Sequence, residues 1–188
     1  MKVWIDIDNP NHLSAYKAII NELRKNGHYV LITAPKSKKL KNLFQEHGLI
    51  VSYIGYKISF LDLFTDQLNL MRSASITDFL KDKKIDIVFS LGSKIMFYVC
   101  LDQKLSLAII QNEIQQDKTI TGYSKCFSLV PESIPEQKLI ESGFNMARVI
   151  RYKGMFNKEE LNFDLRTINE LTGKLEFLSK HMPGSLSA

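Results

Sequence analysis

The sequence predicts an α/β protein with a doubly wound, mainly parallel sheet of about seven strands. Two observations lead to this prediction. Short, nearly continuous apolar segments alternate with segments that carry apolar residues at helical spacing, along most of the 188 residues. Apolar runs of this kind are typical of strands buried on both faces in a parallel sheet covered by helices. Right-handed crossovers then place helices on both faces of the sheet, which is the Rossmann-like arrangement.

The first half of the chain supplies the first strands and helices of this pattern. Residues 2–7 (KVWIDI) predict a strand, and residues 10–26 predict a helix whose stop signal is Gly27. Strands are expected over 29–33 (YVLIT) and 49–54, a helix over 38–47, and a long amphipathic stretch over 60–83.

The second half continues the alternation. Residues 85–90 (IDIVFS) predict a strand, and LGSK turns it into a helix that ends near Leu101. Ser133 and Glu136 have the spacing of a capping box, which predicts a helix as far as Ser142. The other strands are expected over 105–110, 125–130 and 149–152.

Length and composition suit one domain of ordinary size. Hydrophobic residues make up 45% and charged residues 24% of the chain, a normal globular balance. We expect a Rossmann-like domain over 1–157, an amphipathic helix over 158–180 and a frayed tail over 181–188. We expect no signal peptide, because the sequence enters a strand pattern at once, and no apolar run reaches the ~18 residues that span a bilayer.

The cysteines and the charge distribution indicate a compartment and a class of partner. Cys100 and Cys126 lie in apolar surroundings without metal-ligand spacing, which favours free core thiols and a cytoplasmic location. The net charge is +5, and lysines cluster at 36–41 and 81–84. One interpretation is that these clusters attract phosphate groups, including those of lipids at a membrane surface. The other is that they are solvated helix faces. They lack interleaved aromatics and a nucleic-acid motif, so we expect no nucleic-acid partner.

The stretch DIDNPNH holds the first group of candidate site residues, at the carboxyl end of the first predicted strand. Ligands of doubly wound folds bind outside the carboxyl ends of the strands. Asn9 suits the N-cap and Pro10 the first helical position, which leaves Asn11 and His12 in the first turn. The positive helix end disfavours an imidazolium, so His12 is a candidate base for a ligand hydroxyl, or simply a surface histidine in a capping turn. Asp6 is expected in buried pairing or loop bracing.

Two later strand ends supply the other candidates. In SLGSK, Ser90, Gly92 and Ser93 make a strand-to-helix turn whose N–H groups suit an anion or a sugar hydroxyl, unless it is an ordinary turn. In QNE, Asn112 and Glu113 directly follow the fifth strand and are either ligand-binding or loop residues. We expect no metal site and no cofactor in this chain. The chain lacks G-x-G-x-x-G, a Walker A loop, G-x-S-x-G and H-E-x-x-H.

The opening WIDIDNPNH, the later GHYVLITA, SLGS, QNE and VPESIP, and the closing RYKGMFNKEEL together resemble a known family. It is a family of uncharacterised prokaryotic proteins allied to GT-B glycosyltransferases, and the resemblance spans about residues 1–162. The chain departs from the family pattern at Lys94 and Ile95, where a proline and an acidic residue are usual.

The resemblance implies a single GT-B half, the N-terminal domain that usually holds the acceptor, here a sugar or phospho-sugar. A glycosyltransferase-like or sugar-epimerase-like protein is then expected, with the nucleotide-sugar donor bound by a second domain that this chain lacks. A partner chain would supply that domain, and this chain alone would transfer no sugar. Two alternatives remain open: a non-catalytic Rossmann-like binding or regulatory module, and a haloacid-dehalogenase-type phosphatase with Asp6 as its nucleophile.

Overall fold

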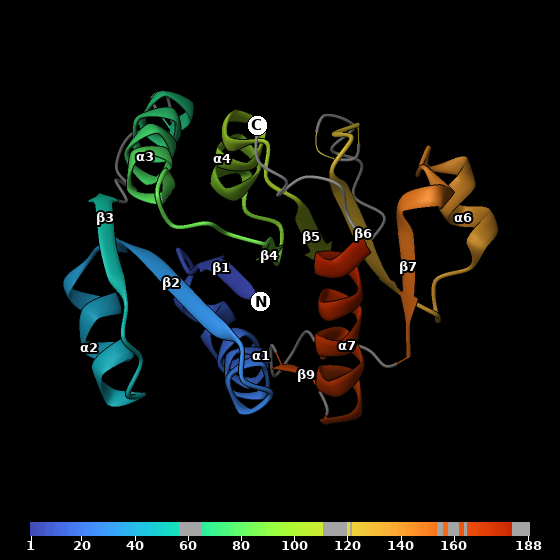
Figure 1. Ribbon diagram of the computed structural model, residues 1–188, viewed down its shortest axis with the longest axis horizontal. Coiled ribbons are helices and arrows are strands. Elements are labelled where there is room, and N and C mark those ends of the chain that lie inside the picture. Colours follow the sequence, from blue (N-terminus) through green and yellow to red (C-terminus); the bar gives the residue numbers. More distant parts are fainter. Residues whose placement is uncertain are drawn as a thin grey trace.

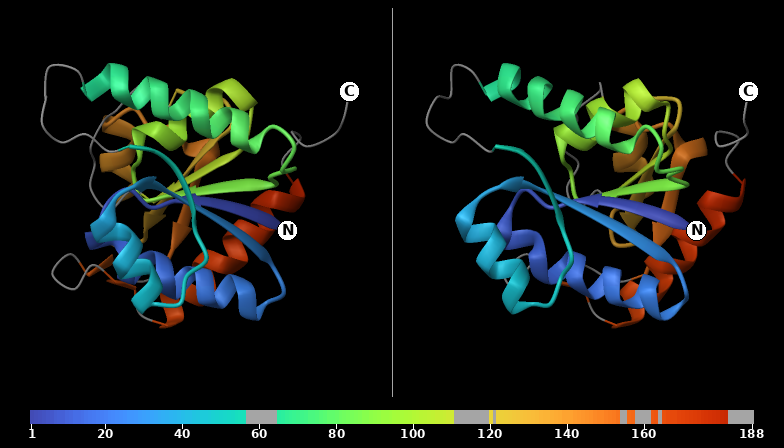
Figure 2. Two further views of the ribbon diagram at one scale, coloured as in Figure 1. Left: turned by 90° about the vertical axis from the view of Figure 1, so that its left-hand side faces the viewer. Right: turned by 60° about the vertical axis from the view of Figure 1, so that its left-hand side comes forward.

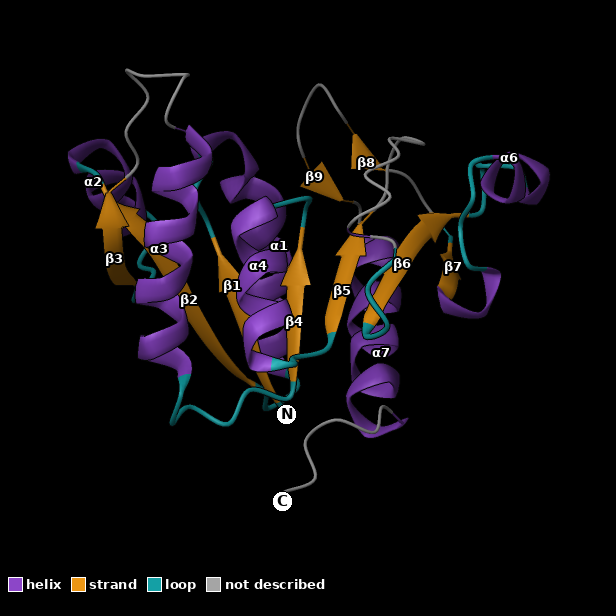
Figure 3. Ribbon diagram, turned by 90° about the horizontal axis from the view of Figure 1, so that it is seen from above, coloured by secondary structure: helices purple, strands orange, loops and turns teal. Residues whose placement is uncertain are grey.

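A seven-stranded sheet, parallel throughout, forms the centre of the molecule in the computed structural model, as predicted (Figures 1 and 3). The structure describes residues 1–56, 65–110, 120, 122–153, 156–157, 162–163 and 165–181. The strands are β1 (Lys2–Asp6), β2 (Tyr29–Lys36), β3 (Ser52–Tyr56), β4 (Ile87–Ser90), β5 (Leu107–Ile110), β6 (Cys126–Pro131) and β7 (Val149–Tyr152). Their order across the sheet is β3-β2-β1-β4-β5-β6-β7.

Helices cover both faces of the sheet (Figure 2). A 3₁₀ turn, η1 (Pro10–His12), leads into α1 (Leu13–Lys25), which lies on one face with α2 (Lys38–Glu46) and α7 (Leu165–His181). The other face carries α3 (Thr65–Leu80) and α4 (Lys94–Gln103), while α6 (Glu136–Glu141) and a second 3₁₀ turn, η3 (Met146–Arg148), lie towards the β7 edge. This two-sided cover explains the apolar strands, since β4 and β5 are buried at every residue.

Each face of the sheet has its own hydrophobic core, because successive strand side chains point to opposite faces. On β1, Val3 and Ile5 join the core under α1 and α7, whereas Trp4 joins the core under α3 and α4. All three side chains are fully buried. The central strand is therefore held from both sides, and its carboxyl end is fixed in place.

The strand order reverses between β1 and β4. From β1 the chain proceeds outward to β2 and β3, then returns to pair β4 with the other side of β1. The loops that leave β1 and β4 consequently diverge to opposite faces of the sheet. In doubly wound folds such a switch point opens a crevice outside the carboxyl ends of the two strands.

The last helix covers this chain's own sheet. Leu171, Leu175 and Leu178 of α7 are buried in the core that α1 and β1 share. Outside the core, His28 Nε2 and Glu176 Oε1 lie 2.8 Å apart and link the start of β2 to α7. A short hairpin of β8 (Phe156–Asn157) and β9 (Asn162–Phe163) precedes α7, so the helix begins at Leu165, later than the predicted start at 158.

Two further predictions of local structure are wrong. The third strand begins at Ser52 and not at Leu49, because Gly48 adopts a left-handed conformation (φ 63°) and the Leu49 N–H still donates to Phe44 O of the preceding helix. The capping box at Ser133 does not form. Pro135 takes the N-cap position of α6 and no side chain caps it, since the chain first turns through a hydrogen bond from Ile134 N–H to Pro131 O.

Both cysteines are free and buried, as expected for core thiols. Burial raises the pKa of the Cys126 thiol to about 12, and it raises the pKa of Cys100 well above its ordinary value. Both thiols therefore stay protonated near neutral pH and act as small hydrophobic side chains. No helix within the described residues combines the length and the hydropathy that a bilayer-spanning segment needs.

Candidate functional site

A cavity of about 270 Å³ lies at the switch point between β1 and β4. One wall is the loop that follows β1 and the other is the turn that follows β4, with α3 adding a side chain. Its lining residues are Asp8, Asn9, His12, Tyr16, Asn69, Leu91, Gly92, Ser93, Lys94 and Ile95. We call it the switch-point cavity. Its volume lies just below the range typical of small-molecule sites.

The loop after β1 is held by hydrogen bonds among its own polar groups. Asn9 is the N-cap of η1, where its side-chain oxygen accepts the Asn11 N–H at 3.0 Å and its backbone oxygen accepts the His12 N–H at 3.1 Å. Pro10 fixes the first residue of the turn. The sequence predicted this cap, and its effect is to set the half-buried His12 on the cavity wall while Asn11 stays exposed outside it.

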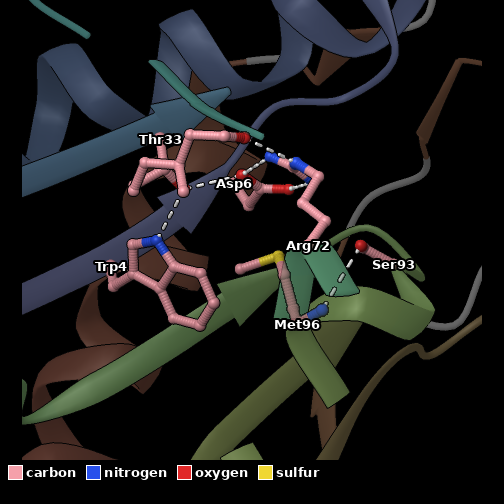
Figure 4. A network of polar contacts seen from close by, with 7 residues as sticks. Trp4, Asp6, Thr33, Arg72, Ser93 and Met96 are labelled. Carbon is pink, nitrogen blue, oxygen red and sulfur yellow. Dashed lines mark hydrogen bonds and ion pairs between the residues drawn. The ribbon is translucent and has the colours of Figure 1, made fainter. Parts of the chain in front are cut away.

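In the turn after β4, two N–H groups donate to a side chain at the end of the strand. The Oγ of the fully buried Ser90 accepts the N–H groups of Gly92 at 3.1 Å and Ser93 at 3.0 Å. Ser93 in turn caps α4, where its Oγ accepts the Met96 N–H at 3.5 Å (Figure 4). Gly92 has a φ of 102°, which only glycine adopts readily. The expectation that this turn offers free N–H groups to an anion is therefore wrong for Gly92 and Ser93.

Tyr16 joins the two walls of the cavity. Its hydroxyl oxygen accepts the Leu91 N–H at 2.9 Å, which ties α1 to the turn after β4. The ring packs edge-on against Phe89 beneath it and lies 6.5 Å from the His12 ring, centroid to centroid. Burial raises the pKa of Tyr16 far above its ordinary value, so the hydroxyl stays neutral. Because His12 and Tyr16 are four residues apart, they occupy one helical face at the cavity.

We predict that Tyr16→Phe lowers the free energy of unfolding by about 1–2 kcal/mol, because the Leu91 N–H loses its acceptor in a half-buried position. Urea denaturation followed by circular dichroism measures the change. Tyr29→Phe is the matched control, since Tyr29 is 58% exposed and its substitution should change stability by less than about 0.5 kcal/mol. Equal effects of the two substitutions would show that Tyr16 does not brace the turn.

A buried ion pair joins the carboxyl end of β1 to α3 (Figure 4). Arg72 of α3 donates from Nη1 to Asp6 Oδ2 at 2.9 Å and from Nη2 to Asp6 Oδ1 at 2.7 Å. Thr33 Oγ1 donates to Asp6 at 2.6 Å and accepts the Trp4 indole N–H at 2.9 Å. Arg72 Nε also donates to Ile54 O at 3.0 Å. Together, these contacts join β1, β2 and β3 to α3.

This network fixes the role of Asp6 as the buried partner that the sequence analysis expected. Burial raises the pKa of its carboxyl, while Arg72 and Thr33 oppose that change. Asp6 is 1% exposed and does not line the cavity, so it is not placed to attack a phosphate ester as the phosphatase alternative requires. Gly55 allows the arrangement, since a Cβ there would lie 2.9 Å from Arg72 Cγ.

The structure brings four of the predicted site residues together: Asn9, His12, Gly92 and Ser93 all line the switch-point cavity. Asn11 and Ser90 do not line it, the first being exposed and the second buried beneath the turn. Asn112 and Glu113 lie outside the described residues. Whether any of these residues binds a substrate stays a prediction.

Sequence reasoning missed several lining residues. Tyr16 is buried in the core under α1 and also lines the cavity, and its i, i+4 spacing from His12 could have indicated this second role. Asn69 carried no local signal, because it reaches the cavity only through the packing of α3. Lys94, noted as a departure from the family pattern, places a cation at the rim. Within the described residues, no three His, Cys, Asp or Glu side chains gather as metal ligands would.

Comparisons with known proteins identify a family. A family model described as "Protein of unknown function (DUF354)" matches residues 1–179. Comparison with the curated proteins finds no match.

Three solved structures share the fold at low sequence identity. They are MurG from Acinetobacter baumannii (13% identity, TM-score 0.59, 84% of this chain and 46% of that one), a protein from Listeria monocytogenes ascribed to the UDP-N-acetylglucosamine 2-epimerases (10%, 0.59, 79% and 43%), and the glycosyltransferase SsfS6 from Streptomyces sp. SF2575 (11%, 0.53, 72% and 52%). The chain thus has the Rossmann-like fold of one GT-B half and spans about half the length of these structures.

Proposed function

The chain belongs to the DUF354 family of proteins of unknown function, and from this premise we propose that it is the acceptor-binding half of a glycosyltransferase-like or sugar-epimerase-like protein. The observation that carries the proposal is the switch-point cavity between β1 and β4. Doubly wound folds bind ligands at this position. The fold shared with GT-B proteins supports the class but not the substrate.

The lining suits a ligand rich in hydroxyl groups. Asn9, Asn69 and Ser93 offer short neutral donors and acceptors. Asp8 and Lys94 place one charge of each sign at the cavity. A sugar, which presents hydroxyls around a small ring, matches this mixture better than a purely apolar or a strongly anionic ligand does.

His12 is the proposed base. It lies on the wall at the amino end of α1, in a turn whose geometry Asn9 fixes. A neutral imidazole there can take the proton from an acceptor hydroxyl as that oxygen attacks the sugar carbon of a donor. The bond from that carbon to the nucleoside diphosphate breaks in the same step, and the diphosphate leaves with the bonding electron pair.

The nucleotide-sugar donor is proposed to bind a second Rossmann-like unit, either in the same polypeptide or on a partner chain. The extent of the match supports this division, since this chain aligns with less than half of MurG. In a two-unit arrangement the acceptor and the donor meet when the cleft closes between the units. The chain described here then contributes acceptor binding and the base.

A titration of the ¹⁵N-labelled chain tests the acceptor role. N-acetylglucosamine and methyl α-glucoside, as acceptor probes, are expected to shift the amide signals of Asn9, His12, Gly92 and Ser93 in a saturable way. UDP-N-acetylglucosamine is expected to leave these signals unchanged at the same concentration. His12→Ala should weaken the sugar response, and His47→Ala should not, since His47 is exposed and does not line the cavity.

Two outcomes of this titration would contradict the proposal. Shifts produced only by the nucleotide sugar would place the donor at this cavity. The absence of any saturable shift with either kind of probe would remove the acceptor site altogether. Sugar binding with no turnover in the complete two-unit protein would favour the non-catalytic binding module.

A further inference from the structure

A second cavity, of about 440 Å³, lies at the carboxyl ends of β2 and β3. It shares no lining residue with the switch-point cavity. Its lining residues are Lys36, Ser37, Lys38, Lys41, Tyr53 and Tyr56. We call it the lysine–tyrosine groove. The lysine cluster noted in the sequence is thus part of a walled groove and not only a solvated helix face.

The groove gathers lysines at the amino end of a helix, a position where positive charge destabilises the helix. Lys38 and Lys41 lie in the first turns of α2, whose first turn holds no acidic residue. Cations at the amino end of a helix oppose its dipole, which already makes that end positive. Among the ion pairs within the described residues, none involves a lysine of the groove. An anion bound in the groove would relieve this accumulated charge.

The tyrosines form an aromatic wall beside these cations. Tyr56, at the end of β3, is 65% exposed, and the Lys36 ammonium lies 5.3 Å from the centroid of its ring. Tyr53, on the same strand, is half-buried and packs against Phe44 of α2. A large exposed ring on a strand end costs solvation free energy, and a ligand body lying on it recovers that free energy.

Ser37 adds a polar group to the lining of the groove. Its Oγ caps α2 by accepting the Leu40 N–H at 3.4 Å. The hydroxyl proton is not used in that contact, so Ser37 can donate it to an oxygen in the groove. The groove therefore offers ammonium donors, a hydroxyl donor and aromatic faces at one place.

We propose that the lysine–tyrosine groove binds a phosphate monoester, with the phosphate held by Lys38, Lys41 and Ser37 and the carbon portion lying on the tyrosine rings. Ammonium and hydroxyl donors near a helix amino end are the groups that bind phosphate oxygens. The phosphate belongs either to a small free ester or to the headgroup of a membrane lipid. The proposal is independent of the acceptor role, because the two cavities have no residue in common.

Two probes applied to the full chain distinguish the sources. Phenyl phosphate represents a free ester, and its binding is followed by the amide shifts of α2 and by calorimetry. Vesicles of phosphatidylcholine with and without phosphatidic acid represent the lipid, and binding is followed by co-sedimentation. Saturable binding of phenyl phosphate without vesicle binding assigns a free ester. Sedimentation that requires phosphatidic acid assigns the lipid headgroup.

Matched variants test whether the groove, and not overall charge, is responsible. Lys41→Ala is expected to weaken binding of the effective probe about fivefold or more. Lys39→Ala removes the same charge from the same helix but does not line the groove, and it should weaken binding by less than about twofold. Tyr56→Ala should weaken phenyl phosphate while leaving inorganic phosphate unchanged.

Both lysines are exposed, so neither variant should impair folding. The proposal is overturned if neither probe binds saturably. It is equally overturned if Lys39→Ala and Lys41→Ala have the same effect, since binding would then follow net charge.

Discussion

Replacing Arg72 with alanine is expected to lower the free energy of unfolding at neutral pH by about 3–5 kcal/mol. The substitution leaves the Asp6 carboxylate buried without its cation and removes both Arg72–Asp6 hydrogen bonds. It also removes the donor to Ile54 O, so α3 loses its link to β3. Urea denaturation at pH 7 measures the loss.

The pH dependence identifies the cause of that loss. Burial raises the pKa of Asp6, and Arg72 opposes the rise, so the variant should have a still higher pKa in the folded state. At pH values between the Asp6 pKa of the unfolded chain and its higher pKa in the folded variant, the folded variant binds more protons than the unfolded chain. The free energy of unfolding of the variant therefore falls as pH rises through this range. The deficit of Arg72→Ala relative to the native chain should therefore be largest at neutral pH and shrink in acid.

A companion substitution controls for lost packing. Asp6→Asn in the Arg72→Ala background removes the uncompensated charge, so it should recover part of the stability at pH 7. Arg24→Ala, at an exposed position near the end of α1, should cost about 1 kcal/mol or less. A deficit that is independent of pH and unrelieved by Asp6→Asn would show that Arg72 acts through packing alone.

The order of the strands and helices could be predicted because burial on both faces imposes an apolar pattern on each strand. β1, β4 and β5 follow this pattern closely, because every residue of β4 and β5 and all but the first of β1 are buried. Element ends were harder to predict. Leu49 has the hydrophobicity of a strand residue, but it completes the end of α2, and no sequence period separates these two uses.

The candidate site was predictable where its signals are local. The cap at Asn9 and the glycine turn at Gly92 are both decided within a few residues, and the switch-point rule brings the two strand ends together. The sequence placed Ser90 in this turn but did not show its burial, because that burial depends on the sheet and not on neighbouring residues. Arg72 was missed because its ion-pair partner Asp6 lies 66 positions away in sequence, and Asn69 because only the packing of α3 brings it to the cavity.

His12→Ala is expected to lower kcat/KM by about 10²–10⁴-fold in the complete two-unit protein, if the chain acts as the proposed acceptor half. The loss should fall mainly on kcat, because the cavity keeps Asn9, Asn69 and Ser93 to hold the acceptor while the base is missing. Initial rates with the acceptor varied at saturating donor separate the two parameters.

The control for this prediction is His47→Ala, which removes an exposed imidazole outside the cavity and should leave kcat unchanged. Thermal unfolding of both variants should match that of the native protein closely, since the His12 ring is half-buried and the η1 turn depends on Asn9 and Pro10. A loss in kcat without a loss in stability would then reflect chemistry at the cavity.

A His12→Ala enzyme that retains more than about a tenth of kcat/KM would show that another group accepts the proton. Asp8 would be the first to test, because its carboxylate can accept a proton and it lines the cavity from the same loop after β1.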